Sequence, residues 1–195
     1  MTTLGLELPT DPRWVNVAEM NIGEILIDHA YCEQKAASSC ISLIVQYPEK
    51  EKLVEVLTPV VAEEWGHFTR VLKELRKRNI PLGRQRKDLY VNALQAQLRT
   101  SSDYHEQLME RLLLNALIEA RSCERFKLLS ENMADESLRK FYRELMVSEA
   151  GHYRNFIELA EEYVPKERVR QRWKEILDIE AGIMATLETR GDRMH

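Results

Sequence analysis

The chain has 195 residues and a formal net charge of −4. This length suits one domain with a sizeable core, and the negative charge excludes general binding of polyanions by the whole surface. No apolar run approaches the roughly 18 residues that a membrane span needs, and the N-terminus lacks the features of a secretory signal. The three cysteines form no CxxC pair, so we expect neither a disulfide framework nor a zinc ribbon, and a reduced, cytoplasmic setting.

Four long helices are predicted from apolar residues that recur at alternating steps of three and four. We expect these core helices at about 17–47, 49–79, 103–131 and 135–163, with a shorter C-terminal helix at about 166–188. The polar stretch 82–100 is expected to be a long crossover between the second and third helices. Two short connections and one long one are typical of a four-helix bundle of two antiparallel hairpins. The predicted fold is therefore all-α, with the whole chain, 1–195, in a single domain.

Local signals mark the starts of the third and fourth helices. Asp103 precedes the third helix with Glu106 three residues further on, which predicts a capping box. Asp135 is the predicted N-cap of the fourth helix. Pro59 lies inside the second helix, where its missing N–H predicts a kink one turn before Glu64.

Six titratable residues fall on the apolar stripes of the core helices, where their side chains should point into the bundle. They are Glu33, Glu64, His67, Glu119, Glu149 and His152. A buried carboxylate without a partner is costly enough that it would usually be neutralised. Four carboxylates and two imidazoles in one core layer need positive charge, and two metal ions would supply it.

The stretches EEWGHF and SEAGHY each place a Glu three residues before a His, at Glu64 and His67 and again at Glu149 and His152. Residues three apart share a helix face, so both can reach one site. A single such pair is more often a surface feature, but two copies on apolar stripes favour a metal centre. Two Glu-x-x-His pairs plus one Glu from each remaining helix form the ligand set of carboxylate-bridged di-iron bundles. Such ligands suit iron or manganese better than zinc.

The third helix offers two candidate ligands. The stretch CEQKA at 32–36 is echoed by CERFK at 123–127, which would match Glu33 with Glu124. Helical level favours Glu119 instead, because Glu124 lies too low and is rotated by about 140° from Glu119. We therefore predict Glu119 as the ligand and keep Glu124 as the alternative, or else as the partner of a nearby Arg.

Two further histidines and the tryptophans carry weaker signals. His29 and His105 are expected to be satisfied or exposed histidines and not ligands. Trp14, Trp65 and Trp173 are expected to be packing or interface residues.

A resemblance to a known family rests on the segments LIDHAYCEQKAAS, EEWGHF, LIEARSCERFKLLS and SEAGHYRNF. In this order and spacing they are similar to the bacterial tRNA 2-methylthio-N6-isopentenyladenosine hydroxylase family of the ferritin-like superfamily. The resemblance covers nearly the whole chain and implies a ferritin-like bundle in which the six residues named above hold two iron ions. It also implies O2-dependent hydroxylation of the isopentenyl group on a modified adenosine beside the tRNA anticodon, with electrons from an external reductase.

Two stretches of the chain are strongly basic. Residues 70–87 contain eight Lys or Arg against one Glu, and residues 166–174 contain five against one. A tRNA anticodon stem-loop presents phosphates that such clusters bind in a salt-dependent way. The predicted tRNA contacts are Arg76, Lys77, Arg78, Arg84, Arg86 and Lys87. The other interpretation is that these side chains only complement the dipole at the C-terminal end of a helix.

The strongest alternative from another class is iron oxidation and storage, as in ferritin and bacterioferritin-like proteins with the same ligand set. Those proteins assemble into large shells and have no need of the basic stretch at 70–87. We therefore prefer the hydroxylase interpretation and expect a monomer or a small homo-oligomer.

Overall fold

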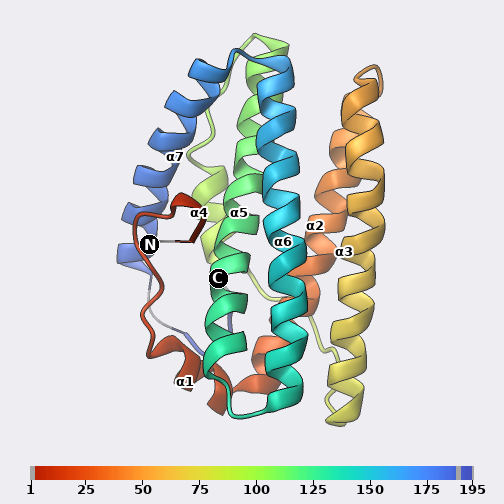
Figure 1. Cartoon of the computed structure of the whole chain (residues 1–195), viewed down its shortest axis with the longest axis vertical. Helices are drawn as coiled ribbons and strands as arrows, with labels where there is room; N and C mark the ends of the chain where they lie inside the picture. The colour runs from red at the N-terminus through yellow and green to blue at the C-terminus, as the bar shows by residue number, and fades with distance from the viewer. Residues whose placement is uncertain (1–2, 188–189, 195) are drawn as a thin grey trace. The chain divides into compact units, whose positions relative to one another are not determined.

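The computed structural model describes residues 3–187 and 190–194, and no strand occurs within these two ranges (Figure 1). The chain falls into two compact units. The α2–α3 unit consists of Arg13–Lys87 and Arg190–Met194. The α5–α6 unit holds the N-terminal residues through Pro12 and the chain from Asp88 through the last helix. Over the described part of the chain, no helix is both long and apolar enough to cross a membrane.

The α2–α3 unit is an antiparallel pair of long helices preceded by a short one. Its helices are α1 (Trp14–Met20), α2 (Ile22–Gln46) and α3 (Glu51–Lys77). The single helix predicted at about 17–47 is divided at Asn21, which has a non-helical backbone (φ −123°, ψ 31°). The Asn21 side chain donates to the carbonyl of Val17 at 2.8 Å, so a side-chain bond competes with the helical ladder where α1 ends.

Helix α3 runs unbroken through Pro59. Leu53, Leu57 and Val71 line its buried face, which also carries Glu64. The helix continues across the proline with its apolar stripe in register. The predicted kink one turn before Glu64 stays a prediction.

The segment after α3 is fastened to α2. The Tyr31 hydroxyl donates to the carbonyl of Gly83 at 2.8 Å, and Gly83 has a φ of +68°, a left-handed conformation that glycine adopts without strain. Arg86 donates to the carbonyl of Asp192 at 3.0 Å and also pairs with Glu24. These contacts order part of the basic stretch predicted to bind RNA.

The α5–α6 unit contains a second antiparallel pair and two further helices. They are α4 (Leu89–Gln95), α5 (Tyr104–Asn132), α6 (Glu136–Tyr163) and α7 (Lys166–Thr186), with a 3₁₀ turn, η1, at Thr3–Gly5. The expected crossover at 82–100 is largely irregular apart from the short helix α4. Each helix pair therefore comes from one of the two predicted hairpins.

The predicted caps of α5 and α6 are present, but the capping box is only half formed. Asp103 accepts hydrogen bonds from the backbone N–H groups of His105 and Glu106 at 2.8 and 2.9 Å. Asp135 accepts from two N–H groups at the start of α6. The Glu106 carboxylate does not return a bond to Asp103 but accepts two from Arg168 of α7, at 3.1 and 2.9 Å. A charge-assisted bidentate pair is stronger than a bond to a neutral N–H, which explains the difference.

Helix α7 is fastened to α5 by further ion pairs. Arg172 donates to both carboxylate oxygens of Glu110 at 2.6 and 2.8 Å, with both side chains buried. In the second basic stretch, 166–174, Arg168 and Arg172 therefore form ion pairs that hold α7 against α5.

Candidate metal centre

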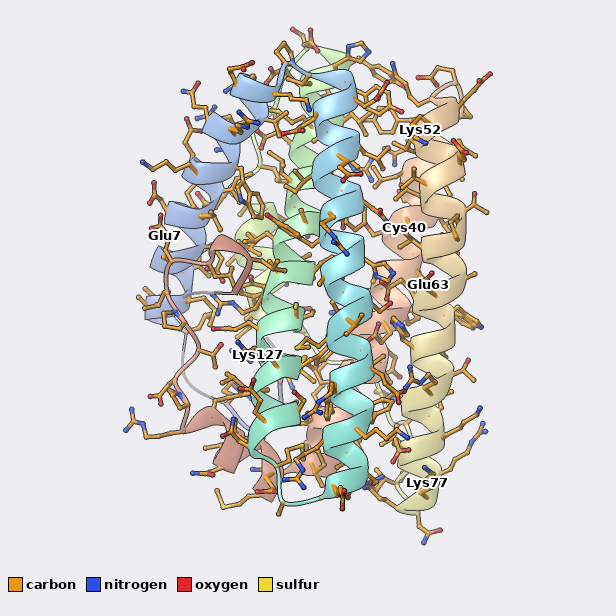
Figure 2. The ribbon with its side chains drawn as sticks, viewed as in Figure 1. Glu7, Cys40, Lys52, Glu63, Lys77 and Lys127 are labelled. Atoms are coloured by element: carbon orange, nitrogen blue, oxygen red, sulfur yellow. The ribbon has the colours of Figure 1, made fainter. Side chains whose placement is uncertain are left out.

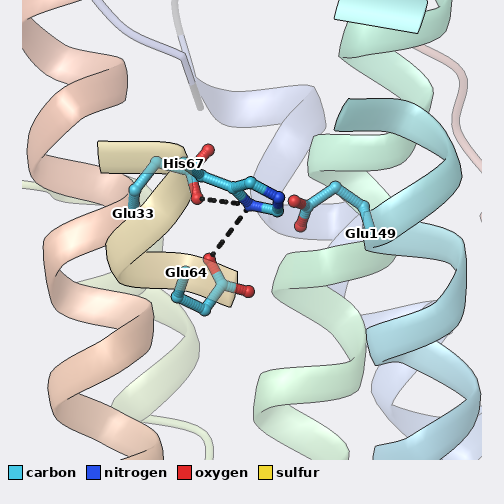
Figure 3. A group of neighbouring side chains, drawn as sticks. All are labelled: Glu33, Glu64, His67 and Glu149. Atoms are coloured by element: carbon cyan, nitrogen blue, oxygen red, sulfur yellow. Dashed lines mark ion pairs between the residues drawn. The ribbon is translucent and has the colours of Figure 1, made fainter. Parts of the chain in front are cut away.

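The α2–α3 unit brings together three of the six predicted residues. Glu33 of α2 and Glu64 of α3 lie at similar distances from the turn at Tyr47, so the antiparallel helices place them level. One ligand atom each of Glu33, Glu64 and His67 lies within 4.8 Å of the others. His67 Nδ1 is 3.5 Å from Glu33 Oε2 and 3.7 Å from Glu64 Oε2 (Figure 3). All three side chains are buried.

Sequence reasoning assigned no role to His29, which contacts this group. Its Nε2 lies 2.5 Å from Glu33 Oε1, one helical turn away on α2, and the residue is completely buried. Burial alone would raise the pKa of Glu33, but hydrogen bonds from His29 and His67 outweigh it and hold that pKa well below its ordinary value. In the sequence, this contact could have been predicted from the i, i+4 spacing of His29 and Glu33. His29 is thus a satisfied histidine, as expected, and holds one oxygen of a candidate ligand.

The α5–α6 unit brings together the other three predicted residues. Glu119 of α5 and Glu149 and His152 of α6 each offer a ligand atom, and these atoms lie within 4.8 Å of one another. All three residues are at most 4% exposed. The two units therefore carry matching groups, each made of two carboxylates and one imidazole.

Glu124, the alternative to Glu119, has a different role. Its carboxylate accepts from the Thr10 N–H at 2.8 Å, the Thr10 hydroxyl at 2.7 Å and Arg121 Nη1 at 2.5 Å. Glu124 is thus the partner of a nearby Arg, and Glu119 is the residue beside Glu149 and His152.

Arg121 also contacts a carboxylate that the sequence analysis did not single out. Its Nε and Nη2 donate to Glu180 Oε1 of α7 at 2.9 and 2.6 Å, and the Tyr90 hydroxyl donates to the same oxygen at 3.1 Å. Burial raises the pKa of Glu180, although Arg121 opposes the shift. No local pattern could have indicated this cluster, since Tyr90, Arg121 and Glu180 lie on three different helices.

A cysteine lies near each group of candidate ligands. Burial, followed by the charge of Glu64, raises the pKa of Cys40 to about 12. Burial, followed by the charge of Glu149, raises the pKa of Cys123 to about 11. Figure 2 shows Cys40 on α2. Both thiols are therefore neutral at physiological pH and offer no thiolate.

The donor set fits a hard or borderline divalent cation. Each group concentrates two buried carboxylates, which are stable as anions only with positive charge beside them. Oxygen donors with one imidazole nitrogen suit iron or manganese, and the neutral thiols add no soft ligand that would favour zinc. The structure thus contains buried Glu/His groups compatible with a metal site.

The predicted RNA-binding residues divide into two sets. Lys77 and Arg78 both pair with the buried Glu74, at 2.6 and 2.7 Å, and Figure 2 shows Lys77 at the C-terminal end of α3. Burial would raise the pKa of Glu74, but these two cations lower it. Arg86 is held by Glu24 and Asp192, as described above. Three predicted residues are exposed and form no ion pair with any residue that the structure describes, namely Arg76, Arg84 and Lys87.

Comparisons with known proteins agree with this picture. The family model described as tRNA-(MS[2]IO[6]A)-hydroxylase (MiaE) matches residues 2–195. A tRNA 2-(methylsulfanyl)-N(6)-isopentenyladenosine(37) hydroxylase of Pseudomonas putida is 38% identical over 160 residues, covering 81% of this chain and 76% of that protein. The protein of the same name from Salmonella typhimurium is 27% identical over 230 residues, covering 92% and 83%.

A solved structure is also similar along nearly the whole chain. It is described as protein 43 with aldehyde deformylating oxygenase activity, from Synechococcus. The TM-score is 0.91 at 34% identity, with 97% of this chain and 94% of that chain covered. The all-α, ferritin-like fold class predicted from the sequence is confirmed.

Proposed function

The chain belongs to the tRNA-(MS[2]IO[6]A)-hydroxylase family, and on this premise we propose that it hydroxylates the isopentenyl group of 2-methylthio-N6-isopentenyladenosine beside the tRNA anticodon. The family match over residues 2–195 carries the proposal. The two buried Glu/His groups support it, because non-haem iron is one of the cofactors with which enzymes use O2 to oxidise C–H bonds. The relatives described above are named as hydroxylases and an oxygenase, so storage of iron finds no support in them.

We further propose that the two units together form one ferritin-like domain and hold a pair of iron ions. The proposed ligands are Glu33, Glu64, His67, Glu119, Glu149 and His152. Their donor chemistry supports this assignment, since four carboxylates balance the charge of two divalent ions and each imidazole adds a neutral nitrogen. Bound iron would supply the activation of O2, with electrons from an external reductase.

The chain's own residues have roles that follow from their contacts. His29 occupies Oε1 of Glu33, which leaves Oε2 on the side of His67 for a metal. Such an outer hydrogen bond fixes the orientation of a carboxylate ligand. Cys40 and Cys123 stay protonated, so they do not compete as thiolate ligands or as nucleophiles.

The substrate is proposed to be held by exposed cations of the α2–α3 unit. Arg76, Arg84 and Lys87 are the members of the predicted cluster without an internal ion pair among the described residues. Arg78 and Arg86 serve mainly to order the segment after α3. We place the enzyme in the cytoplasm as a monomer or small homo-oligomer, in keeping with its three free cysteines.

A single-turnover experiment tests the function. Protein loaded with ferrous iron and reduced is mixed with O2 and tRNA carrying the methylthiolated, prenylated adenosine, and the digested nucleosides are examined by mass spectrometry. We expect a gain of one oxygen atom on that nucleoside. E64Q and H152A should abolish it, whereas E63Q should not, because Glu63 is an exposed carboxylate next to Glu64 on α3 (Figure 2).

The outcomes separate the parts of the proposal. Two bound irons per chain without any product would contradict the substrate assignment. Failure to bind iron at all would contradict the ligand assignment. Large shells on gel filtration would favour storage.

A further inference from the structure

Trp65 differs from the other two tryptophans in its surroundings. Trp14 is buried, with its Nε1 donating to the carbonyl of Arg190 at 3.1 Å, and Trp173 packs against Tyr153 at a ring distance of 5.7 Å. Trp65 is 53% exposed on α3. Its one ring neighbour among the described residues is Phe68, at 4.9 Å and a tilt of 40°.

The internal repeat indicates that Trp65 is not needed for the metal group. In EEWGHF the Trp stands between the Glu and the Gly, whereas SEAGHY has Ala150 at that place. Glu149 and His152 nevertheless come within the same 4.8 Å limit as Glu64 and His67. A bulky, exposed aromatic thus stands at this place in only one of the two matching units.

Trp65 begins a continuous face of α3. At 100° per residue, Trp65, Phe68, Leu72 and Arg76 fall within an arc of about 80°, and Lys73 borders it. Phe68 and Leu72 are half-buried, while Lys73 and Arg76 are exposed. We call these five residues the outer face of α3.

This face carries free positive charge. Neither Lys73 nor Arg76 forms an ion pair with another side chain in the described ranges, and Glu74 between them is buried and committed to Lys77 and Arg78. The exposed carboxylate of Glu63 lies about 160° round the helix from Trp65. The outer face of α3 thus combines aromatic rings with cations and has no carboxylate of its own.

We propose that the outer face of α3 binds single-stranded RNA, with a base of the anticodon loop stacked on Trp65 and Phe68 and the adjoining phosphates paired with Lys73 and Arg76. Exposed aromatics beside a basic groove are the usual means of holding unpaired nucleotides. The inference rests on the proposed function, which supplies a tRNA loop as substrate.

The geometry also indicates which base is held there. Glu64 and Trp65 are adjacent in α3, so their side chains diverge by about 100°. Glu64 points to the buried group and Trp65 to solvent. In the proposed complex the base on Trp65 is a neighbour of the modified adenosine, since Trp65 is the residue next to the candidate ligand Glu64.

The direct test measures binding without chemistry. A synthetic anticodon stem-loop with unmodified adenosine is titrated into metal-loaded protein, and tryptophan emission and fluorescence anisotropy are recorded. We expect emission to be quenched in the wild type and much less in W65F. W65A should weaken binding roughly 5- to 150-fold with little change in its salt dependence. K73Q/R76Q should weaken it and reduce the slope against salt by about 1.4.

Two control variants match these changes. V45A removes an exposed apolar side chain, 70% exposed, from α2 of the same unit. K52Q removes an exposed cation at the other end of α3 from Lys77, as Figure 2 shows. Both should bind the stem-loop as the wild type does. Iron content and helicity should be unchanged in W65A, which separates lost stacking from misfolding.

Unquenched emission together with wild-type affinity of W65A would overturn the proposal. If W65A binds RNA normally but turns over slowly with a protein reductase and normally with a chemical one, the face docks the reductase instead. If the wild type binds the stem-loop through Trp65 but forms no hydroxylated product, the RNA platform stands and only the proposed reaction falls.

Discussion

His29 Nε2 lies 2.5 Å from Glu33 Oε1, and both side chains are buried in α2 one turn apart. This pair gives a testable division of roles between a candidate ligand and the residue that orients it. We expect H29A to lower affinity for ferrous iron about 10- to 100-fold while leaving the fold intact, because hydrogen bonds behind metal ligands commonly have effects of this size. Competition with a chelator measures the affinity for ferrous iron. H105A, which changes an exposed histidine, should bind iron normally, and equal affinities for all three proteins would contradict the role given to His29.

Glu119 and Glu124 should respond in opposite ways to the same substitution. E119Q is expected to lose iron and keep its stability, since the carboxylate lies in the group with Glu149 and His152. E124Q should keep iron but lose about 1–3 kcal/mol of unfolding free energy, because it leaves Arg121 buried without full compensation. Urea denaturation and iron analysis on both variants decide the matter. Iron loss in E124Q alone would restore Glu124 as the ligand.

The buried thiols predict a stability change at alkaline pH. The pKa of Cys40 is raised from 9.0 to about 12, so the folded state favours the neutral thiol. The neutral, buried Cys40 thiol stabilises the fold fully below pH 9.0, which is the pKa of this thiol in the unfolded chain. This contribution to the free energy of unfolding is lost as the pH rises from 9.0 toward about 12, the pKa in the folded state. Unfolding free energies measured from pH 8 to pH 10 should therefore fall less steeply in C40A than in the wild type. Val45, an exposed residue of α2 without a titratable group, provides the control, and V45A should retain the wild-type slope.

Two glycines precede the histidines of the repeated motif without a packing reason. A Cβ at Gly66 or Gly151 would meet nothing within 4 Å in the part of the chain that the structure describes. G66A and G151A should each stabilise the protein by about 0.5–1 kcal/mol, because alanine favours a helix interior. G191A is the contrast and should destabilise the protein, since its Cβ would come 2.7 Å from the backbone carbonyl oxygen of Val17. Thermal unfolding of the three variants checks this, and a loss of stability in G66A or G151A would show a requirement for glycine that packing does not explain.

Arg84 and Arg86 are near neighbours with different expected effects. R86Q should reduce stability by up to about 1 kcal/mol, because its ion pairs with Glu24 and Asp192 are partly exposed. R84Q should leave stability unchanged but lower RNA affinity and flatten its salt dependence by about 0.7–0.9, the value for one phosphate contact. Denaturation and stem-loop titrations on both proteins measure these effects. Identical behaviour of the two variants would contradict the separation into structural and RNA-binding cations.

Sequence periodicity alone determined the four long helices, apart from the break at Asn21, and the residues on their buried faces. Glu64 and His67 could be assigned to one face, as could Glu149 and His152, because a three-residue step returns to the same side of any helix. The caps at Asp103 and Asp135 were equally local, since each bonds N–H groups two and three residues away.

The tertiary structure decided the questions that depend on distant parts of the chain. Glu124 accepts from Thr10, 114 residues away, and this contact favours Glu119 over Glu124 as the candidate ligand. Arg86 bonds to Asp192, 106 residues away, which separates it from the exposed cations near it in the sequence. Helical spacing predicts which side of a helix a residue occupies but not which residue lies opposite it. For a charged side chain, that opposite residue determines whether the charge is available to a ligand or stabilises the fold.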